Sequence, residues 1–417
     1  MARRVFPRAV TLKAVSLRPN AVAELFLVFL RLGLTSFGGP VAHLGYFRAE
    51  LVVNRGWLSE AAYAELVALC QVLPGPASSQ VGMGVGLLRA GGWGLLAAWL
   101  GFTLPSALLM FGFALGLDRL NQSGLGSLDG AGWLAGLKVA ALAVVAAAVS
   151  AMAVTLTPDA PRRTLAVLVA TLVLVFPYSW VQPLTLLLAG ALGWRWLAAP
   201  DPASSDGLMA PLSRRAGASL LLFTLALLLA LPLLAAAFPR PDLHLFDIFT
   251  RAGALVFGGG HVVLPLLQAG VVPRFLDAGT FVAGYGAVQA VPGPLFSFAS
   301  FLGAAAHSGL HPAYAALLTT VGLFLPAGLL VTGVLPFWSG LRRRSGFQRA
   351  LSGLNAGVVG LLLAALYTPV FTSAVQVGPR GALQVALALA AYLALSAWKV
   401  PPWAVVLSCA GVGALVL

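Results

Sequence analysis

Long apolar runs, separated by short polar breaks, dominate the pattern along the chain. About 20 apolar residues in a helix cross a hydrocarbon core of about 30 Å. The pattern predicts an all-α polytopic membrane protein with about 13 transmembrane segments. These lie near residues 22–47, 61–88, 92–117, 132–156, 164–178, 181–197, 217–238, 244–270, 281–306, 312–337, 350–368, 381–397 and 402–417.

Two of these segments contain the same interruption. "QVLPGP" occupies 71–76 and "QAVPGP" occupies 289–294. Each proline removes a helical hydrogen bond and clashes with the preceding turn, and a bilayer offers no water to the freed backbone groups. The motif therefore predicts broken helices. The first, second, eighth and ninth segments all carry Gly or Pro breaks, so some of them could be paired half-helices that do not cross.

The two halves of the chain align with each other. "LFLVFLRLGLTSFGG" (25–39) matches "LFDIFTRAGALVFGG" (245–259), and "GFTLPSALL" (101–109) matches "GLFLPAGLL" (322–330). Six segments in each half, joined by one extra segment (217–238), predict two inverted-topology repeats, an organisation found in many secondary transporters. The predicted divisions are a basic cytoplasmic tail (1–20), a first repeat (21–200), a linker with a connecting transmembrane helix (201–243) and a second, inverted repeat (244–417).

Composition and charge agree with this interpretation. The chain is 60% hydrophobic and 9% charged, with a formal net charge of +13. Alternating the loops across the membrane places 17 of the 25 Lys and Arg residues inside, five outside and three within segments. This bias predicts a cytoplasmic N-terminus and favours a membrane protein over a nucleic-acid binder.

No enzyme motif accompanies these segments. The five histidines form no HExxH, no paired Asp motif stands in a segment, and the two cysteines have no metal or disulfide spacing. We therefore expect no catalytic residues, no metal and no cofactor.

Four short motifs carry a resemblance to a known family: "FGGP" (37–40), "LPGP" (73–76), "FGGGH" (257–261) and "VPGP" (291–294). With them the chain resembles the chromate transporter family in its long, two-domain form. The resemblance implies a multi-pass inner-membrane carrier that exports chromate and confers chromate resistance, with sulfate as a chemically similar anion. Beyond the lipid bilayer, the sequence leaves a homodimer open as a further partner.

The Pro-Gly-Pro breaks are the first candidate for an anion site. A helix that restarts after such a break directs free N–H groups and the positive end of its dipole at the break, and anions bind there. Candidate residues are Gln71, Pro74, Gly75, Pro76, Ser78 and Ser79 in the first repeat and Gln289, Pro292, Gly293, Pro294 and Ser297 in the second. The alternative is a kink that serves packing alone.

Glycines and cations near the breaks complete the predicted site. Gly38, Gly39, Gly258 and Gly259 permit close backbone approach, although small residues also serve membrane helix packing. Intramembrane cations are functional candidates, but could instead form ion pairs with Glu24, Glu65 or Asp247. The cationic and polar candidates are Arg31, Arg251, Lys138, its repeat partner Asn355, and His261. For His43 and His261 the alternative is a packing role, and either could be a pH-sensitive donor.

The membrane potential favours export. A dianion that leaves an inside-negative cell gains about 4.6 kcal/mol per 100 mV, so expulsion needs no second ion. The alternative function is proton-coupled import of sulfate or another oxyanion. That function would require titratable groups in the pathway, for which Glu65 and Asp247 are the candidates.

Overall fold

The structure is a computed structural model that describes residues 20–37, 39–122, 132–176, 178, 181–198, 212–256, 262–341 and 344–417. These residues form helices and connecting loops without a strand. Six stretches among them are long and apolar enough to cross a membrane: Ala77–Leu120, Gly132–Leu156, Arg214–Ala237, Pro312–Leu341, Ser345–Ala374 and Pro379–Ser396. The prediction of an all-α polytopic membrane protein is confirmed, while the number of crossings stays a prediction.

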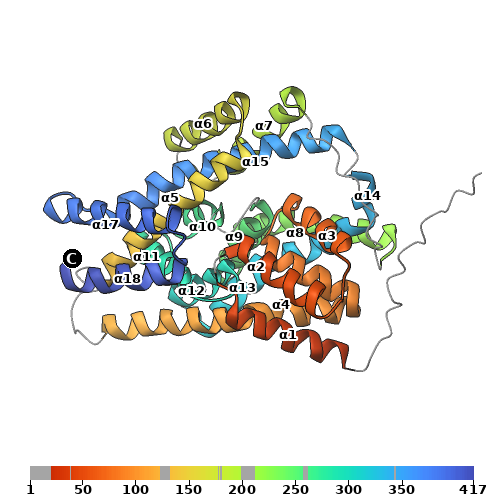
Figure 1. Ribbon diagram of the computed structural model, residues 1–417, viewed down its shortest axis with the longest axis horizontal. Helices are drawn as coiled ribbons and strands as arrows, with labels where there is room; N and C mark the ends of the chain where they lie inside the picture. Colours follow the sequence, from red (N-terminus) through yellow and green to blue (C-terminus); the bar gives the residue numbers. More distant parts are fainter. Residues whose placement is uncertain are drawn as a thin grey trace, which may run out of the picture.

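The described residues of the first half form seven α-helices and a π-helical turn, arranged as Figure 1 shows. They are α1 (Ala21–Thr35), α2 (Gly39–Phe47), η1 (Arg48–Asn54), α3 (Glu60–Val72), α4 (Ala77–Gln122), α5 (Gly132–Leu156), α6 (Ala160–Val175) and α7 (Val181–Trp196). The connecting helix α8 (Arg214–Ala237) follows.

The second half repeats this order with small interruptions. Its elements are α9 (Pro241–Leu255), α10 (Val263–Val271), α11 (Ala278–Val288), η4 (Leu295–Ser297), α12 (Phe298–Ala305), α13 (Pro312–Val334), η5 (Leu335–Phe337), α14 (Trp338–Leu341), α15 (Ser345–Ala365), η6 (Leu366–Phe371), α16 (Thr372–Ala374), α17 (Pro379–Ser396) and α18 (Pro402–Val416).

Matching local signals start the helices that lead into the two Pro-Gly-Pro breaks. The Ser59 side chain accepts a hydrogen bond from the Ala62 N–H at the start of α3. The Asp277 carboxylate accepts one from the Thr280 N–H at the start of α11. Both are N-caps, which satisfy donors that the first helical turn leaves free. The two helices therefore begin at corresponding positions and reach their breaks in the same register.

Helix α4 is bent near its first quarter. Ala90 has φ −144° and ψ 26°, and Gly91 has φ +62° and ψ −151°, a left-handed backbone that glycine adopts at low cost. The bend separates a half-helix, 77–89, from a long helix, 92–122. The second repeat separates the same parts more fully, because a loop divides the half-helix 295–305 from α13.

The two halves interlock along their long helices. Helix α5 packs on α17 and α18 of the second half, and α15 packs on α6 and α7 of the first. A side chain at Gly136 would collide with the backbone carbonyl of Cys409, and one at Gly353 with that of Ala189. Such small residues allow close helix packing in membranes. Each half therefore completes the other's packing.

Large apolar side chains remain uncovered on the connecting helix. On α8, Leu222, Leu229 and Leu233 are 66%, 61% and 71% exposed. A water-facing helix would carry polar residues on its exposed side. This surface is suited to contact with lipid.

Candidate functional site

Short helices lie on either side of both breaks. Helix α3 has 13 residues and α11 has 11. At 1.5 Å per residue these lengths are about 20 Å and about 16 Å, less than the hydrocarbon core of about 30 Å. Neither helix can cross a membrane alone, so the breaks lie at the ends of half-length elements.

In the first repeat these elements form two helical hairpins whose open ends lie side by side. Four residues in contact at these open ends, Glu24, Arg55, Trp57 and Arg89, are called the first base. The Arg55 Nη1–Glu24 Oε1 distance is 3.0 Å, and the Arg89 Nη2–Glu24 Oε2 distance is 3.1 Å. The Arg89 guanidinium stacks 4.0 Å from the Trp57 ring centroid. The start of α1, the loop before α3 and the end of the half-helix 77–89 therefore lie together.

The second repeat has corresponding hairpins and its own base. The His307 N–H donates to the Phe275 carbonyl at 2.9 Å, which joins the end of α12 to the loop before α11. The Arg274 guanidinium lies 5.1 Å from the Phe275 ring centroid. A side chain at Gly270 of α10 would collide with Ile248 of α9, which places these helices side by side. The hairpin plan is thus present in both halves.

The closed ends of the hairpins, here called the tips, meet at one place. Each Pro-Gly-Pro tip forms a backbone hydrogen bond with the other repeat. The Gly75 N–H donates to the Val256 carbonyl at 2.6 Å, and the Gly293 N–H donates to the Ser36 carbonyl at 2.9 Å. Ser36 and Val256 occupy matching positions before their Phe-Gly-Gly runs. The two glycines have φ +125° and +96°, which L side chains rarely adopt. The two Pro-Gly-Pro breaks therefore form one junction by exchanging hydrogen bonds.

Side-chain packing at the junction follows the same exchange. A Cβ at Gly75 would lie 3.1 Å from Cβ of Ala327, and one at Gly293 would lie 3.0 Å from Oγ of Ser106. Ser106 and Ala327 are matching residues of "GFTLPSALL" and "GLFLPAGLL". Each break therefore packs on the long helix of the other repeat.

Buried polar atoms without a hydrogen-bond partner gather on elements around the junction. Ser79 and Ser297 occupy corresponding places in the two half-helices, are 2% and 0% exposed, and have unpartnered Oγ atoms. Further described atoms of this kind on these elements include Ser36 Oγ, His43 Nε2, Gln80 Oε1, Thr103 Oγ1, Thr250 Oγ1 and Gln289 Nε2, and, farther along α4, Arg89 Nε and Trp99 Nε1. Buried polar groups normally find partners. Their concentration on these elements fits a site for a polar ligand.

The structure brings together only part of the predicted site. Pro74, Gly75, Pro76, Ser78, Ser79, Gln289, Pro292, Gly293, Pro294 and Ser297 lie at or beside the junction, and Gly39 has φ +77° at the start of α2. Gln71 is exposed and Asn355 half-buried. Gly38, Gly258, Gly259 and His261 lie outside the described residues.

Arg31, Arg251 and Lys138 make no hydrogen bond or ion pair with the described residues at the tips. Arg31 is exposed. The Arg251 side chain is 46% exposed, and its Nε donates to Asp247 Oδ1 at 2.8 Å. The Lys138 ammonium approaches Gly279 at the start of α11, the end farthest from the break. Of the two carboxylates proposed for proton coupling, Asp247 is thus ion-paired, and Glu65 is buried at 3% exposure.

Sequence reasoning missed several polar residues on the junction's elements. Ser36, Thr103 and Ser106 are buried. Gln80, which the sequence places beside Ser78 and Ser79 as a further donor in the first turn, is buried as well, and its Nε2 donates to the Pro74 carbonyl at 2.8 Å. Thr103 and Ser106 lie within an apolar run, and only the alignment of the repeats draws attention to them.

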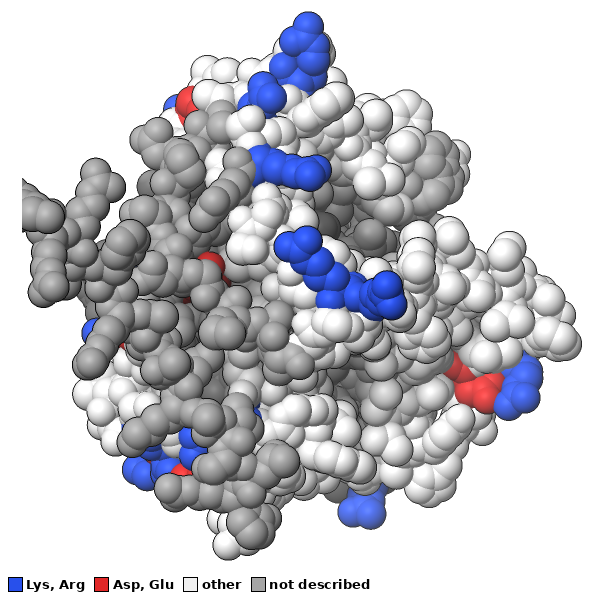
Figure 2. All heavy atoms as spheres, turned by 90° about the vertical axis from the view of Figure 1, so that its right-hand side faces the viewer, with Lys and Arg blue, Asp and Glu red and all other residues white. Residues whose placement is uncertain are grey.

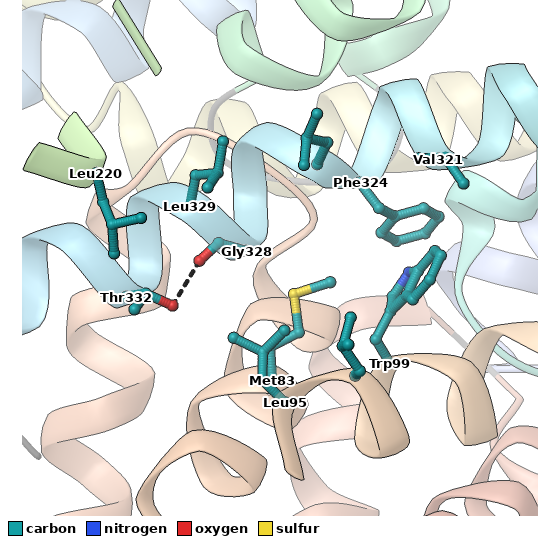
Figure 3. Close-up of a pocket in the computed structure, with 11 residues that line it drawn as sticks. Met83, Leu95, Trp99, Leu220, Val321, Phe324, Gly328, Leu329 and Thr332 are labelled. Atoms are coloured by element: carbon teal, nitrogen blue, oxygen red, sulfur yellow. Dashed lines mark hydrogen bonds between the residues drawn. The ribbon is translucent and has the colours of Figure 1, made fainter. Parts of the chain in front are cut away.

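A separate cavity of about 260 Å³ lies between α4, α8 and α13 (Figure 3). Met83, Trp99, Leu220, Phe324 and Gly328 are among its lining residues, and nearly all of the lining is apolar. An anion would lose its hydration there and gain few donors, chiefly the indole N–H of Trp99. The cavity is therefore unsuited to an oxyanion.

Sequence comparisons identify the family. The sequence model of the chromate transporter family matches residues 23–194 and again 243–414. This chain belongs to the chromate transporter family. It is 30% identical to a chromate transport protein of Pseudomonas aeruginosa over 82% of this chain and 80% of that protein. It is 29% identical to one of Cupriavidus metallidurans over 82% and 81%. Comparison with solved structures finds no match.

Proposed function

We propose that this protein is a secondary transporter that exports chromate or a similar tetrahedral oxyanion across the inner membrane and thereby confers chromate resistance. One observation carries the proposal: two Pro-Gly-Pro breaks exchange backbone hydrogen bonds in a chain of the chromate transporter family. The relatives from Pseudomonas and Cupriavidus bear the name chromate transport protein. The junction supplies half-helix N-termini and buried donors, which are the groups that an oxyanion needs.

The proposed architecture has hairpins that dip into the membrane from opposite faces. Helix 92–122 runs from the first base to the far side, where α5 begins. Lys138, near the start of α5, contacts Gly279 beside the second base. This contact supports opposite faces for the two bases, as an inverted repeat requires. Four of the thirteen apolar segments then become hairpins that do not cross, and nine cross.

Charge supports placing the first base in the cytoplasm. Eleven described cations then lie on its face: Arg48, Arg55, Arg89, Arg162, Arg163, Arg195, Arg214, Arg215, Arg344, Arg349 and Lys399. Five lie opposite: Arg119, Lys138, Arg240, Arg274 and Arg380. Arg48, Arg55 and Arg274 change sides relative to simple loop alternation, which strengthens the positive-inside bias. The end of the molecule seen in Figure 2 shows far more blue Lys and Arg than red Asp and Glu.

The mechanism follows from the junction. Free N–H groups of the half-helices, with hydroxyl and amide donors, hold the dianion without a fixed positive charge, so that it can be released. Rocking of the repeats would open the junction first to one face and then to the other. The membrane potential drives the dianion outwards, by about 4.6 kcal/mol per 100 mV.

Reconstituted vesicles test this function. Flux of labelled chromate and sulfate would be measured under an imposed potential of either sign, with and without a pH gradient. We expect chromate to move towards the positive side without a pH gradient. Flux that requires the proton gradient would support the importer instead and would direct attention to Glu65 and Asp247. No oxyanion flux under any condition would refute the assignment.

A further inference from the structure

The imidazole of His43 lies between two half-helices of the first repeat. Helix α2 begins at Gly39, and His43 follows one turn later with an exposure of 1%. Its Nδ1 is 3.3 Å from Oγ of Ser78, in the first turn of the half-helix 77–89. Phe102 meets the ring edge-on, with centroids 5.3 Å apart. These contacts fix the ring where two helix N-termini converge.

The other ring nitrogen has no hydrogen-bond partner of ordinary geometry among the described residues. His43 Nε2 is buried and unpartnered by that criterion, although the Ser36 backbone carbonyl lies near the ring. A buried polar atom left in this way destabilises the fold unless another group satisfies it. Packing alone would be served equally well by an apolar side chain, so the unpartnered nitrogen indicates a ligand.

The second repeat supplies a natural comparison. In the ungapped alignment of the Phe-Gly-Gly runs, Val263 corresponds to His43. In the alignment of the Pro-Gly-Pro motifs, Phe296 corresponds to Ser78. Both are buried, at 0% and 2% exposure. The fold therefore accommodates an apolar pair at this place, and the first repeat carries a polar pair that packing does not require.

We propose that His43 binds the transported oxyanion through its Nε2–H, and that Ser78 positions the ring. This proposal rests on the oxyanion transport proposed above and identifies a binding residue for it. In this proposal the Ser78 hydroxyl is the donor to Nδ1, which selects the neutral tautomer that carries its proton on Nε2. A neutral donor binds a tetrahedral oxyanion and still allows its release.

Two amide substitutions separate the roles of the ring nitrogens. The glutamine side chain in His43→Gln reaches about as far as Nε2, whereas the asparagine in His43→Asn reaches only about as far as Nδ1. We expect His43→Gln to keep the KM for chromate within about threefold in vesicles. We expect His43→Asn, and His43→Val, which copies the second repeat, to raise KM about tenfold or more. Val263→Ala is the matched control, for which we expect an unchanged KM.

Stability measurements keep the test independent of folding. Thermal unfolding of each purified variant would be measured with and without saturating chromate. A bound ligand raises the unfolding temperature, so His43→Asn should fold but lose most of this increase. Wild-type KM in His43→Asn, or equal losses in the Gln and Asn variants, would overturn the role of Nε2. A wild-type protein that neither binds nor transports chromate or sulfate would instead refute the proposed function itself.

Discussion

The two Pro-Gly-Pro breaks have the same backbone arrangement, but the repeats that carry them differ in their side chains. Both glycines have positive φ, and each donates its N–H to the carbonyl before the other repeat's Phe-Gly-Gly. The first repeat contributes Ser36, Gln80, Thr103 and Ser106, together with His43 and Ser78, and Ser36 and Ser106 of these lie against Gly293 of the second break. The corresponding residues of the second repeat are Val256, Phe298, Phe324, Ala327, Val263 and Phe296.

This difference separates the requirements of the junction from those of the ligand. The exchanged hydrogen bonds depend on the backbone, so both copies must keep glycine at the tip. Donor side chains are needed only where the anion binds, and the second repeat retains few, chiefly Ser297, Gln289 and Thr250. Substitutions of the tip glycines should therefore have similar effects in both repeats, whereas substitutions of donor side chains should have unequal effects.

The largest effect should come from the tip glycines. Gly75→Val and Gly293→Val each place a branched side chain at positive φ and within 3.1 Å of a neighbouring atom. We expect both to reduce chromate flux in vesicles to background, because strain of about 1–2 kcal/mol adds to the collision. Gly112→Ala, whose added methyl meets nothing within 4 Å, is the control. Full flux in only one of the two valine variants would contradict a shared backbone requirement.

A smaller and unequal effect is expected from the matched serines. Ser79→Ala should raise the KM for chromate by about fivefold to tenfold, and Ser297→Ala by about twofold, because the first repeat supplies most of the buried polar side chains at the junction. Neither change should lower the unfolding temperature without ligand, since each removes a buried hydroxyl that makes no hydrogen bond to the part of the chain that the structure describes. Kinetics and unfolding of both variants would be measured side by side. Equal rises in KM would show that the two repeats contribute equally to the anion site, which would contradict this prediction.

Much of this arrangement was accessible from sequence because helix breakers act locally. Proline and glycine at 74–76 and 292–294 predicted the breaks, and the internal alignment predicted that they would correspond. The hydrogen bond between Gly75 and Val256 was not predictable, because it joins residues that are remote in the chain. It also requires that the broken segments form hairpins instead of crossing the membrane. Arg31 and Arg251 stand out in the sequence because each is a charge in an apolar run, whereas their exposure and the Asp247 ion pair depend on packing, which the sequence does not show.

The bases of the hairpins differ in their ion pairing, and a third pair of substitutions uses this difference. Arg89→Ala removes an ion pair with Glu24 and a stack on Trp57, a loss of about 1–2 kcal/mol for partly exposed groups. We expect the unfolding temperature to fall by about 1–3 °C, with flux reduced no more than about twofold. Arg274→Ala removes only a stack on Phe275 and should cost less. A greater loss at Arg274 would show that the second base is the stronger one.

The smallest effect on transport is expected from a substitution in the apolar cavity. This substitution tests whether the cavity belongs to the anion pathway. A methyl group added by Gly328→Ala would lie 3.7 Å from Sδ of Met83, an ordinary contact, and would partly fill the cavity. Alanine also favours a helix over glycine by about 0.5–1 kcal/mol. We expect an unfolding temperature equal to or slightly above that of the wild type, with an unchanged KM for chromate. A rise in KM without loss of stability would place part of the pathway in this cavity. Since Gly328 and Ala327 are neighbours on α13, and Ala327 contacts the first break, an unchanged KM would confine the anion to the junction itself.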